Sequence, residues 1–175
     1  MIDFTRNHFE LFGLPARFRI DADALETAYR ALQSDVHPDR YASGSEAERR
    51  LALQSSARVN EAYAALKDPV ERARYLLTLS GVDALDETDT QLPMEFLERQ
   101  LERREAASDA AAANDVGALD AVLDDVRRET GERERELERM FDARDTGAAR
   151  ALVRELKFLN KVAADVDAAI SALDG

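Results

Sequence analysis

Apolar residues recur at intervals of three and four along most of the chain, which is the spacing of one face of an α-helix. The first long segment with this pattern carries Leu25, Ala28, Tyr29, Leu32 and Val36. A second segment follows, and its apolar members are Leu51, Leu53, Ala57, Val59, Ala62, Tyr63 and Leu66. The pattern predicts two helices joined by a short loop, and we find no convincing period-two strand in the sequence.

The loop between these two segments begins with the tripeptide His37-Pro38-Asp39. Proline fixes its own φ, lacks an N–H donor and pushes the preceding residue out of the helical region, so the first helix has to end near His37. Taken alone, the tripeptide is an ordinary helix stop, since Pro and Asp are common turn residues.

The helical pattern stops at Ser80-Gly81, and a short acidic segment, Val82 to Gln91, follows. We interpret residues 81–92 as a linker between an N-terminal domain, residues 1–80, and a C-terminal domain, residues 93–175. Thr90 is a candidate cap for the next helix, and Pro93 is well tolerated in a first turn. That helix is expected to run to about Ala113.

Two further helices are expected after a break at Asn114 and Asp115. The apolar seam of the first consists of Val116, Leu119, Leu123, Val126, Thr130, Leu137 and Met140, with Arg133 as its chief exception. After Asp145-Thr-Gly147 the last helix repeats the pattern with Leu152, Leu156, Leu159, Ala163, Val166, Ile170 and Leu173. Short connections between long amphipathic helices imply antiparallel neighbours, so the second half is predicted to form a three-helix bundle.

Composition supports an all-α fold, because the chain has only 7 Gly and 4 Pro among its 175 residues and few aromatic residues. Charge is distributed unevenly. Residues 1–80 carry 11 basic and 12 acidic side chains, whereas residues 81–175 carry 13 basic and 24 acidic ones, so the net charge of −12 belongs mainly to the second half. Such a surface repels phosphate backbones, and no nucleic-acid partner is expected there.

The chain contains no cysteine and only 2 histidines, which excludes disulfides, thiolate ligands and a Cys nucleophile. We expect no metal and no cofactor. No run approaches the roughly 20 apolar residues of a membrane span, and the N-terminus lacks the pattern of a secretory signal. We therefore expect a cytoplasmic protein without a membrane partner.

Several blocks of sequence occur in an order that identifies a family. The chain has a short apolar N-terminal segment, a helix, the His-Pro-Asp loop and a second helix, and this order resembles the J-domain of the DnaJ co-chaperones. It is most similar to the HscB branch, which serves iron-sulfur cluster assembly. The blocks that carry this similarity are Phe9 to Arg17, His37 to Ser45, Gln54 to Ala57 and Arg72 to Leu79. Four ordered blocks are a far more specific signal than one tripeptide.

The resemblance implies that His37, Pro38 and Asp39 contact a DnaK-type chaperone of the HscA kind and stimulate its ATPase, with Arg30 and Arg40 assisting. A rigid proline can present the carboxylate for charge-assisted hydrogen bonds to a partner's Arg or Lys. J-domains generally carry more basic residues in the helix before the loop, whereas this one has Arg30 beside Glu26 and Asp35. Electrostatic steering is accordingly expected to be weaker, or shifted to Arg49, Arg50 and Arg58.

Catalysis by the loop itself is not favoured. A general base at His37 oriented by Asp39 would need a geometry that near neighbours in a loop seldom reach. The sequence also shows no placed nucleophile, second acid or phosphate loop. We expect no enzymatic activity.

The helix after Pro93 combines apolar and acidic positions. Leu97 and Leu101 lie four apart, and glutamates at 98, 102 and 105 follow the adjacent stripe. The resemblance to HscB implies that this face binds an IscU-like iron-sulfur scaffold protein. The residues carried over are Leu97, Leu101, Glu102, Glu105 and Phe158.

A simpler interpretation of the same helix stays open. Leu97 and Leu101 would then belong to the bundle core, and the glutamates would pair with Arg99, Arg103 and Arg104, which contributes only about 0.2 to 1 kcal/mol per exposed pair. Two alternatives for the whole protein also remain. One is a J-protein with a different client, and the other is a helical adaptor that self-associates and has no chaperone partner.

Overall fold

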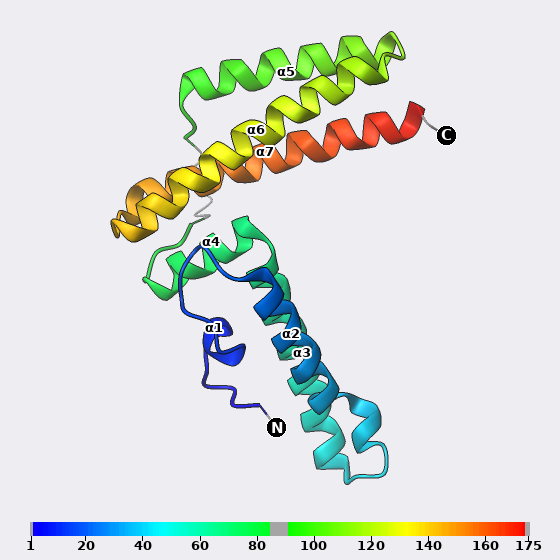
Figure 1. Ribbon diagram of the computed structural model, residues 1–175, viewed down its shortest axis with the longest axis vertical. Coiled ribbons are helices and arrows are strands. Elements are labelled where there is room, and N and C mark those ends of the chain that lie inside the picture. The colour runs from blue at the N-terminus through cyan, green and yellow to red at the C-terminus, as the bar shows by residue number, and fades with distance from the viewer. Residues whose placement is uncertain (1, 85–90, 174–175) are drawn as a thin grey trace. The chain divides into compact units, whose positions relative to one another are not determined.

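The computed structural model describes residues 2–84 and 91–173, and every regular element in these ranges is helical. Figure 1 shows the succession of these helices along the chain. The chain divides into two compact units, Met1–Leu76 and Leu77–Gly175. The predicted all-α class, with a helical hairpin followed by a three-helix bundle, is confirmed. The linker expected over residues 81–92 includes residues 85–90, which lie outside the described residues.

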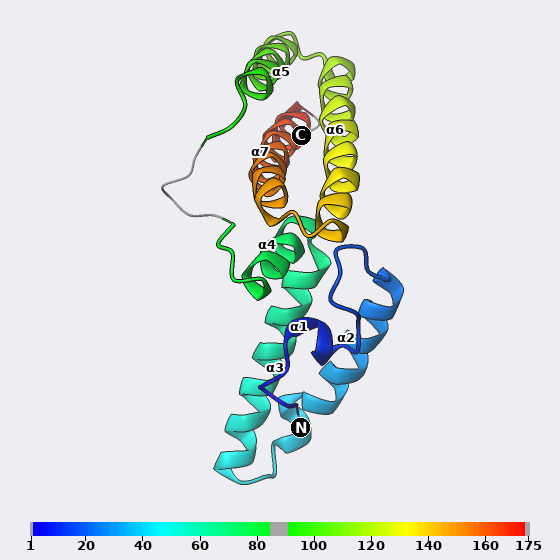
Figure 2. The same cartoon turned by 90° about the vertical axis from the view of Figure 1, so that its left-hand side faces the viewer.

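The first unit is built around an antiparallel hairpin of α2 (Ala22–Val36) and α3 (Glu46–Lys67), which lie side by side in Figures 1 and 2. The short helix α1 (His8–Leu11) precedes it, and α4 (Pro69–Leu79) begins directly after it. Side chains satisfy the exposed first-turn amides: Asn7 and Glu10 form a capping box on α1, Ser45 and Glu48 form one on α3, and Asp21 caps α2. Local sequence thus sets where each helix begins.

Apolar residues at helical spacing hold the hairpin together. The buried apolar residues on α2 and α3 are Leu25, Val36, Ala52, Val59, Ala62 and Leu66. Two further contacts join the helices. The rings of Tyr29 and Tyr63 stack with their centroids 3.9 Å apart, and the Tyr29 hydroxyl donates a hydrogen bond to Asn60 at 3.0 Å. The two helices are therefore fixed in register with each other.

Arg72 links three segments of this unit. Its Nε donates to the Phe18 carbonyl at 2.7 Å, and its Nη1 donates to the Leu66 carbonyl at 2.6 Å. The guanidinium also lies over the Phe18 ring, 5.1 Å from its centroid. These contacts tie the segment before α2, the end of α3 and α4 together, because one forked cation can serve several acceptors at once.

The second unit contains α5 (Met94–Ala112), α6 (Val116–Asp142) and α7 (Thr146–Leu173). The predicted break at Asn114 and Asp115 is confirmed. Asn114 has a φ of 54°, and Asp115 accepts from the Ala118 amide at 2.9 Å. Helix α5 begins with Pro93 in the cap position and no side-chain cap, and Thr90, the expected cap, lies outside the described residues.

The connection between α6 and α7 has the same construction as the first turn of the bundle. Arg144 has a φ of 57°, and Asp145 accepts from the Ala148 amide at 2.9 Å. Helix α7 begins at Thr146, slightly earlier than expected, so Gly147 lies in its first turn rather than before it. In both turns the left-handed residue ends one helix, and the aspartate directly after it caps the start of the next.

The bundle core contains residues from all three helices. Its buried members are Phe96, Ala110, Leu119, Leu123, Val126, Leu159, Val162 and Val166. The predicted seams of α6 and α7 are confirmed, since their leucines and valines at these positions are buried or half-buried. Figures 1 and 2 show α5 packed against α6 and α7, whose longer hairpin continues beyond it.

Candidate functional site

The His-Pro-Asp tripeptide lies at the tip of the α2–α3 hairpin, where it joins the last turn of α2 to a 3₁₀ turn, η1 (Pro38–Tyr41). Val36 is buried and anchors the end of α2. His37 has left the helical region, with φ −58° and ψ 128°, as expected for a residue before proline. The helix end predicted from the sequence is confirmed.

The side chains of His37 and Asp39 face solvent from this turn. The His37 Nδ1 accepts from the Asp39 amide at 3.3 Å and lies 3.6 Å from Asp39 Oδ2. The Asp39 side chain is 91% exposed and the His37 side chain 54% exposed. The loop therefore offers one imidazole and one free carboxylate to a partner from a backbone that Pro38 stiffens.

Arg40 and Tyr41 fold back onto α2 instead of pointing outward together with Asp39. Arg40 Nη1 donates to the Ser34 carbonyl at 3.1 Å and to Asp35 Oδ1 at 3.2 Å. The Tyr41 hydroxyl donates to the Asp35 carbonyl at 3.2 Å. These bonds satisfy carbonyl groups that the end of a helix leaves without intrahelical partners, and they hold the loop in place.

The arginines of this unit differ in how far they are neutralised. Arg30 donates to Glu26 at 2.9 Å, and Arg50 donates to Glu46 at 2.9 Å. Arg49 is exposed, and within the described residues no carboxylate pairs with it. The two residues expected to assist the loop, Arg30 and Arg40, are thus both engaged with carboxylates of their own hairpin.

On α5, the leucines singled out from the sequence lie outside the core. Leu97 is 38% exposed and Leu101 is 58% exposed, while the buried residues of this helix are Phe96, Gln100, Arg103 and Ala110. Each residue turns an α-helix by about 100°, so Leu97 lies well away from the direction of Phe96. The interpretation that placed Leu97 and Leu101 in the bundle core is wrong.

Acidic side chains border this apolar strip. Glu98, Glu102 and Glu105 are exposed, and within the described part of the bundle no arginine pairs with them. The expected pairing with Arg99, Arg103 and Arg104 is therefore not formed. Met94, the first residue of α5, is 71% exposed and extends the strip by one turn, although the sequence pattern did not single it out.

The remaining residue carried over from the family, Phe158, lies on α7. It is half-buried and packs edge-to-face on Phe96, with ring centroids 5.8 Å apart. Phe158 is therefore partly a core residue, and only a portion of its ring is accessible. We call the surface formed by Met94, Leu97, Leu101, Glu102 and Glu105 the α5 face.

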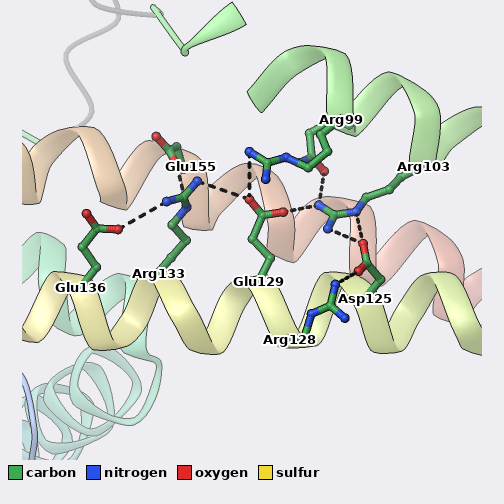
Figure 3. A network of polar contacts seen from close by, with 9 residues as sticks. Arg99, Arg103, Asp125, Arg128, Glu129, Arg133, Glu136 and Glu155 are labelled. Carbon is green, nitrogen blue, oxygen red and sulfur yellow. Dashed lines mark hydrogen bonds and ion pairs between the residues drawn. The ribbon is translucent and has the colours of Figure 1, made fainter. Parts of the chain in front are cut away.

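Arg103 points from the opposite side of α5 into the bundle (Figure 3). Its Nε donates to Asp125 Oδ2 at 2.8 Å, and its Nη1 donates to Gln100 Oε1 at 3.2 Å and also to Glu129. Burial opposes the charged guanidinium, but the hydrogen bonds that it donates to Asp125 and Glu129, together with the charges of these carboxylates, outweigh burial and raise the pKa of Arg103. The sequence pattern gave no indication of this role for Arg103.

A second set of charges joins α6 to α7. Arg133, the exception in the α6 seam, donates to Glu129 at 3.4 Å and to Glu136 at 3.3 Å, and its Nε lies 2.8 Å from Glu155 Oε2 without the alignment of a hydrogen bond. Burial raises the pKa of Glu155, opposed by Arg133. The signal that could have predicted this role is the presence of acidic residues on α6 and α7 that can pair with an arginine in the seam.

No group of three or more His, Cys, Asp or Glu side chains in the described ranges is arranged to hold a metal ion. No helix of residues 2–84 and 91–173 is long and apolar enough to cross a membrane. What the two surfaces offer is recognition: an exposed carboxylate on a stiff loop, and an apolar strip with an acidic border.

Comparison with protein families gives one match in each of the two compact units. Residues 7–75 match the family model of the DnaJ domain, and residues 92–167 match the model described as the HSCB C-terminal oligomerisation domain. The first unit is thus a J-domain, and the class of protein is a J-domain co-chaperone.

Individual relatives extend over nearly the whole chain. A co-chaperone protein HscB homolog from Burkholderia thailandensis is 48% identical and covers 99% of both chains. The solved structure of chaperone HscB from Vibrio cholerae has a TM-score of 0.87 at 36% identity and covers 96% of this chain and 99% of that one. The human co-chaperone HscB has a TM-score of 0.89 at 26% identity, covering 95% and 83%.

This chain belongs to the HscB family of co-chaperones. The resemblance inferred from the sequence motifs is therefore confirmed. Its relatives are named co-chaperones, which is a non-enzymatic role.

Proposed function

We propose that this chain stimulates the ATPase of a specialised, HscA-like DnaK-type chaperone and delivers an IscU-like scaffold protein to it during iron-sulfur cluster assembly. The observation that carries this proposal is the presence of two separate recognition surfaces on one chain. These surfaces are the His-Pro-Asp loop of the J-domain and the α5 face of the bundle.

The loop acts on the chaperone by binding. His37, Pro38 and Asp39 engage the chaperone in its ATP-bound state, and the exposed Asp39 carboxylate pairs with a basic group of that partner. A ligand shifts an equilibrium only by binding one state more tightly than another, so the loop favours the arrangement of the chaperone that hydrolyses ATP. Arg40 contributes by holding the loop, and Arg30 by adding charge beside it.

The α5 face binds the scaffold protein. Leu97 and Leu101 supply apolar contact, the accessible part of Phe158 adds to it, and Glu102 and Glu105 form an acidic rim. Exposed apolar groups of this kind, bordered by polar residues, mark protein interaction sites. A matching partner carries an apolar patch surrounded by Lys or Arg.

Carrying both surfaces on one chain brings the scaffold protein close to the chaperone. A scaffold held on the α5 face is present at high effective concentration beside the chaperone that the loop engages. ATP hydrolysis then traps the scaffold on the chaperone.

We propose that this cycle takes place in the cytoplasm. We further propose that residues 1–80 form the J-domain, residues 81–92 the linker and residues 93–175 the client-binding domain.

ATP hydrolysis by the chaperone tests the proposal directly. The rate is measured for the chaperone alone, with this chain, with the scaffold protein, and with both. Stimulation greater than the sum of the separate effects is expected. Stimulation by the chain without any added effect of the scaffold would favour a J-protein with a different client, and no stimulation would favour an adaptor.

Self-association is a second candidate role for the same surface. The matched C-terminal family model is described as an oligomerisation domain, and the α5 face exposes three large apolar side chains, Met94, Leu97 and Leu101. Sedimentation of the wild-type chain and of a Leu97→Ala, Leu101→Ala variant distinguishes the roles. A dimer that the variant abolishes would assign the α5 face to self-association.

A further inference from the structure

Helix α5 has few large apolar contacts with the rest of its bundle. Its buried residues are Phe96, Gln100, Arg103 and Ala110, of which only Phe96 is both large and apolar. Helix α7, in contrast, buries Leu152, Leu156 and Leu159 among others. Since hydrophobic stabilisation is roughly proportional to the apolar area buried, the attachment of α5 depends more on its polar contacts.

The strongest of these polar contacts is made by Arg103, whose side chain is only 8% exposed. Its guanidinium donates to Asp125 through both Nε and Nη2, and to Glu129 through Nη1. Arg99 adds a weaker link, with its Nη2 3.8 Å from Glu129 Oε1 (Figure 3). Two N–H groups of one planar guanidinium converge on Asp125 Oδ2 while a third N–H reaches Glu129, and this restricts the orientation of Arg103, whereas apolar contacts tolerate sliding and rotation.

The two leucines of the α5 face point away from Arg103 on the same helix. Leu101 precedes Arg103 by two residues, which is a rotation of about 200°. Arg103 therefore points into the bundle while Leu101 points outward, and a rotation of α5 that broke the Arg103 contacts would also turn Leu97 and Leu101 toward or away from the neighbouring helices.

We propose that Arg103 is a positioning residue for client binding: its pairing with Asp125 and Glu129 holds α5 in the rotation that presents Leu97 and Leu101 outward. Arg103 itself does not touch the client. The part of this inference that concerns the client rests on the proposed function, whereas the attachment of α5 by Arg103 does not.

Hydrogen exchange of the full chain, with no partner present, tests the attachment. In Arg103→Gln the amides of α5 are expected to exchange about tenfold faster than in the wild type, while those of α6 and α7 change little. The matched control is Arg128→Gln, because Arg128 pairs with the same Asp125 but its side chain is 70% exposed. Unchanged exchange in α5 of the Arg103 variant would overturn the proposal.

Removing Arg103 takes away the most buried partner of Asp125 and Glu129, although Arg128 still pairs with Asp125 and Arg133 with Glu129. Weaker compensation of a buried charge is destabilising. If Arg103→Gln loosens all three helices together, the milder Asp125→Asn variant decides, since Asp125 is 37% exposed and Arg103 keeps Glu129. Faster exchange restricted to α5 is then expected, and exchange equal to that of Arg128→Gln would refute the proposal.

A double-mutant cycle with the purified scaffold protein separates positioning from direct contact. On its own, Arg103→Gln is expected to weaken scaffold binding about tenfold. Added to the Leu97→Ala, Leu101→Ala variant, it is expected to cause no further loss. Losses that simply add would mean that Arg103 acts independently of Leu97 and Leu101 and would refute positioning. A wild-type chain that fails to bind the scaffold would sink the proposed function, and the exchange experiment would still decide the role of Arg103.

Discussion

The backbone N–H of His8 donates to the hydroxyl of Tyr75 at 3.0 Å, and the two rings lie with their centroids 4.0 Å apart. This contact joins α1 to α4 across 67 residues of sequence. His8 is 5% exposed, and its Nδ1 has no hydrogen-bond partner among the described residues. Burial lowers the pKa of His8, the nearby charge of Arg58 lowers it further, and Glu61 acts in the opposite direction.

This arrangement predicts that acid destabilises the J-domain. Because the pKa of His8 is lower in the folded chain, the unfolded chain takes up the proton first as the pH falls. The contribution of neutral His8 to the free energy of unfolding is therefore fully present above a pH of about 6.5 and is lost as the pH drops below it. Urea titrations at pH 7.5 and 5.5, followed by NMR signals of α1 to α3, measure the loss. His8→Phe keeps a ring against Tyr75 but cannot bind a proton, so it should lose less stability. An equal loss in both proteins would remove His8 as the cause.

Replacing His37 by Gln is expected to abolish stimulation of the chaperone ATPase while leaving the fold and scaffold binding intact. The side chain is 54% exposed and makes one hydrogen bond, accepted from the Asp39 amide at 3.3 Å, so it contributes little to stability. ATPase rates and far-UV circular dichroism, measured on the same preparations, check both parts. Retained stimulation by a folded variant would refute the role of the loop.

Replacing Leu97 and Leu101 by Ala is expected to weaken scaffold binding by about tenfold or more, since apolar anchors dominate such interfaces. Stability should change little, because both side chains are exposed. Leu53→Ala is the matched control: Leu53 is 58% exposed, as is Leu101, but lies on α3 of the J-domain. Calorimetric titration with the scaffold measures the affinity. If the double variant binds as tightly as the Leu53 control, the α5 face is not the site.

The turn between α6 and α7 contains a correctable strain. Arg144 has a φ of 57°, a region that costs a residue with a Cβ atom roughly 1–2 kcal/mol. Arg144→Gly should therefore raise the free energy of unfolding of the bundle by about 1 kcal/mol, offset in part by the greater freedom of glycine in the unfolded chain. Urea unfolding measures it.

The twin turn between α5 and α6 provides an internal comparison for this prediction. Asn114 has a φ of 54°, and asparagine tolerates this region better than arginine does. Asn114→Gly is accordingly expected to stabilise the bundle less than Arg144→Gly does. The reverse order would argue against backbone strain as the cause.

Signals read from the sequence were most accurate where their cause is local. Pro38 ends α2 by its own covalent geometry, and Asp115 caps α6 by reaching an amide three residues ahead. The apolar seams of α6 and α7 were also predicted correctly, because a helix with one strongly apolar stripe has a single face to bury. The motif blocks that identified the family lie on these same local features.

Helix α5 shows where such signals fail. Its sequence contains two stripes that could face the bundle, one with Leu97 and Leu101 and one with Phe96 and Arg103. Hydrophobicity alone favours the leucine stripe, yet Phe96 and Arg103 are the residues that are buried. The choice depends on Asp125 and Glu129, which belong to α6 and meet Arg103 only after the helices have packed.

The sequence by itself determined the all-α class, the helix boundaries at proline and at capping residues, the His-Pro-Asp loop and the family. Each depends on covalent geometry, on periodicity or on residues within a few positions of one another. The tertiary structure alone decided which stripe of α5 is exposed and why Arg133 is tolerated in a seam. These outcomes depend on charges that lie far apart in the sequence, and their pairing free energy exists only once folding has removed them from water and brought them within hydrogen-bond distance.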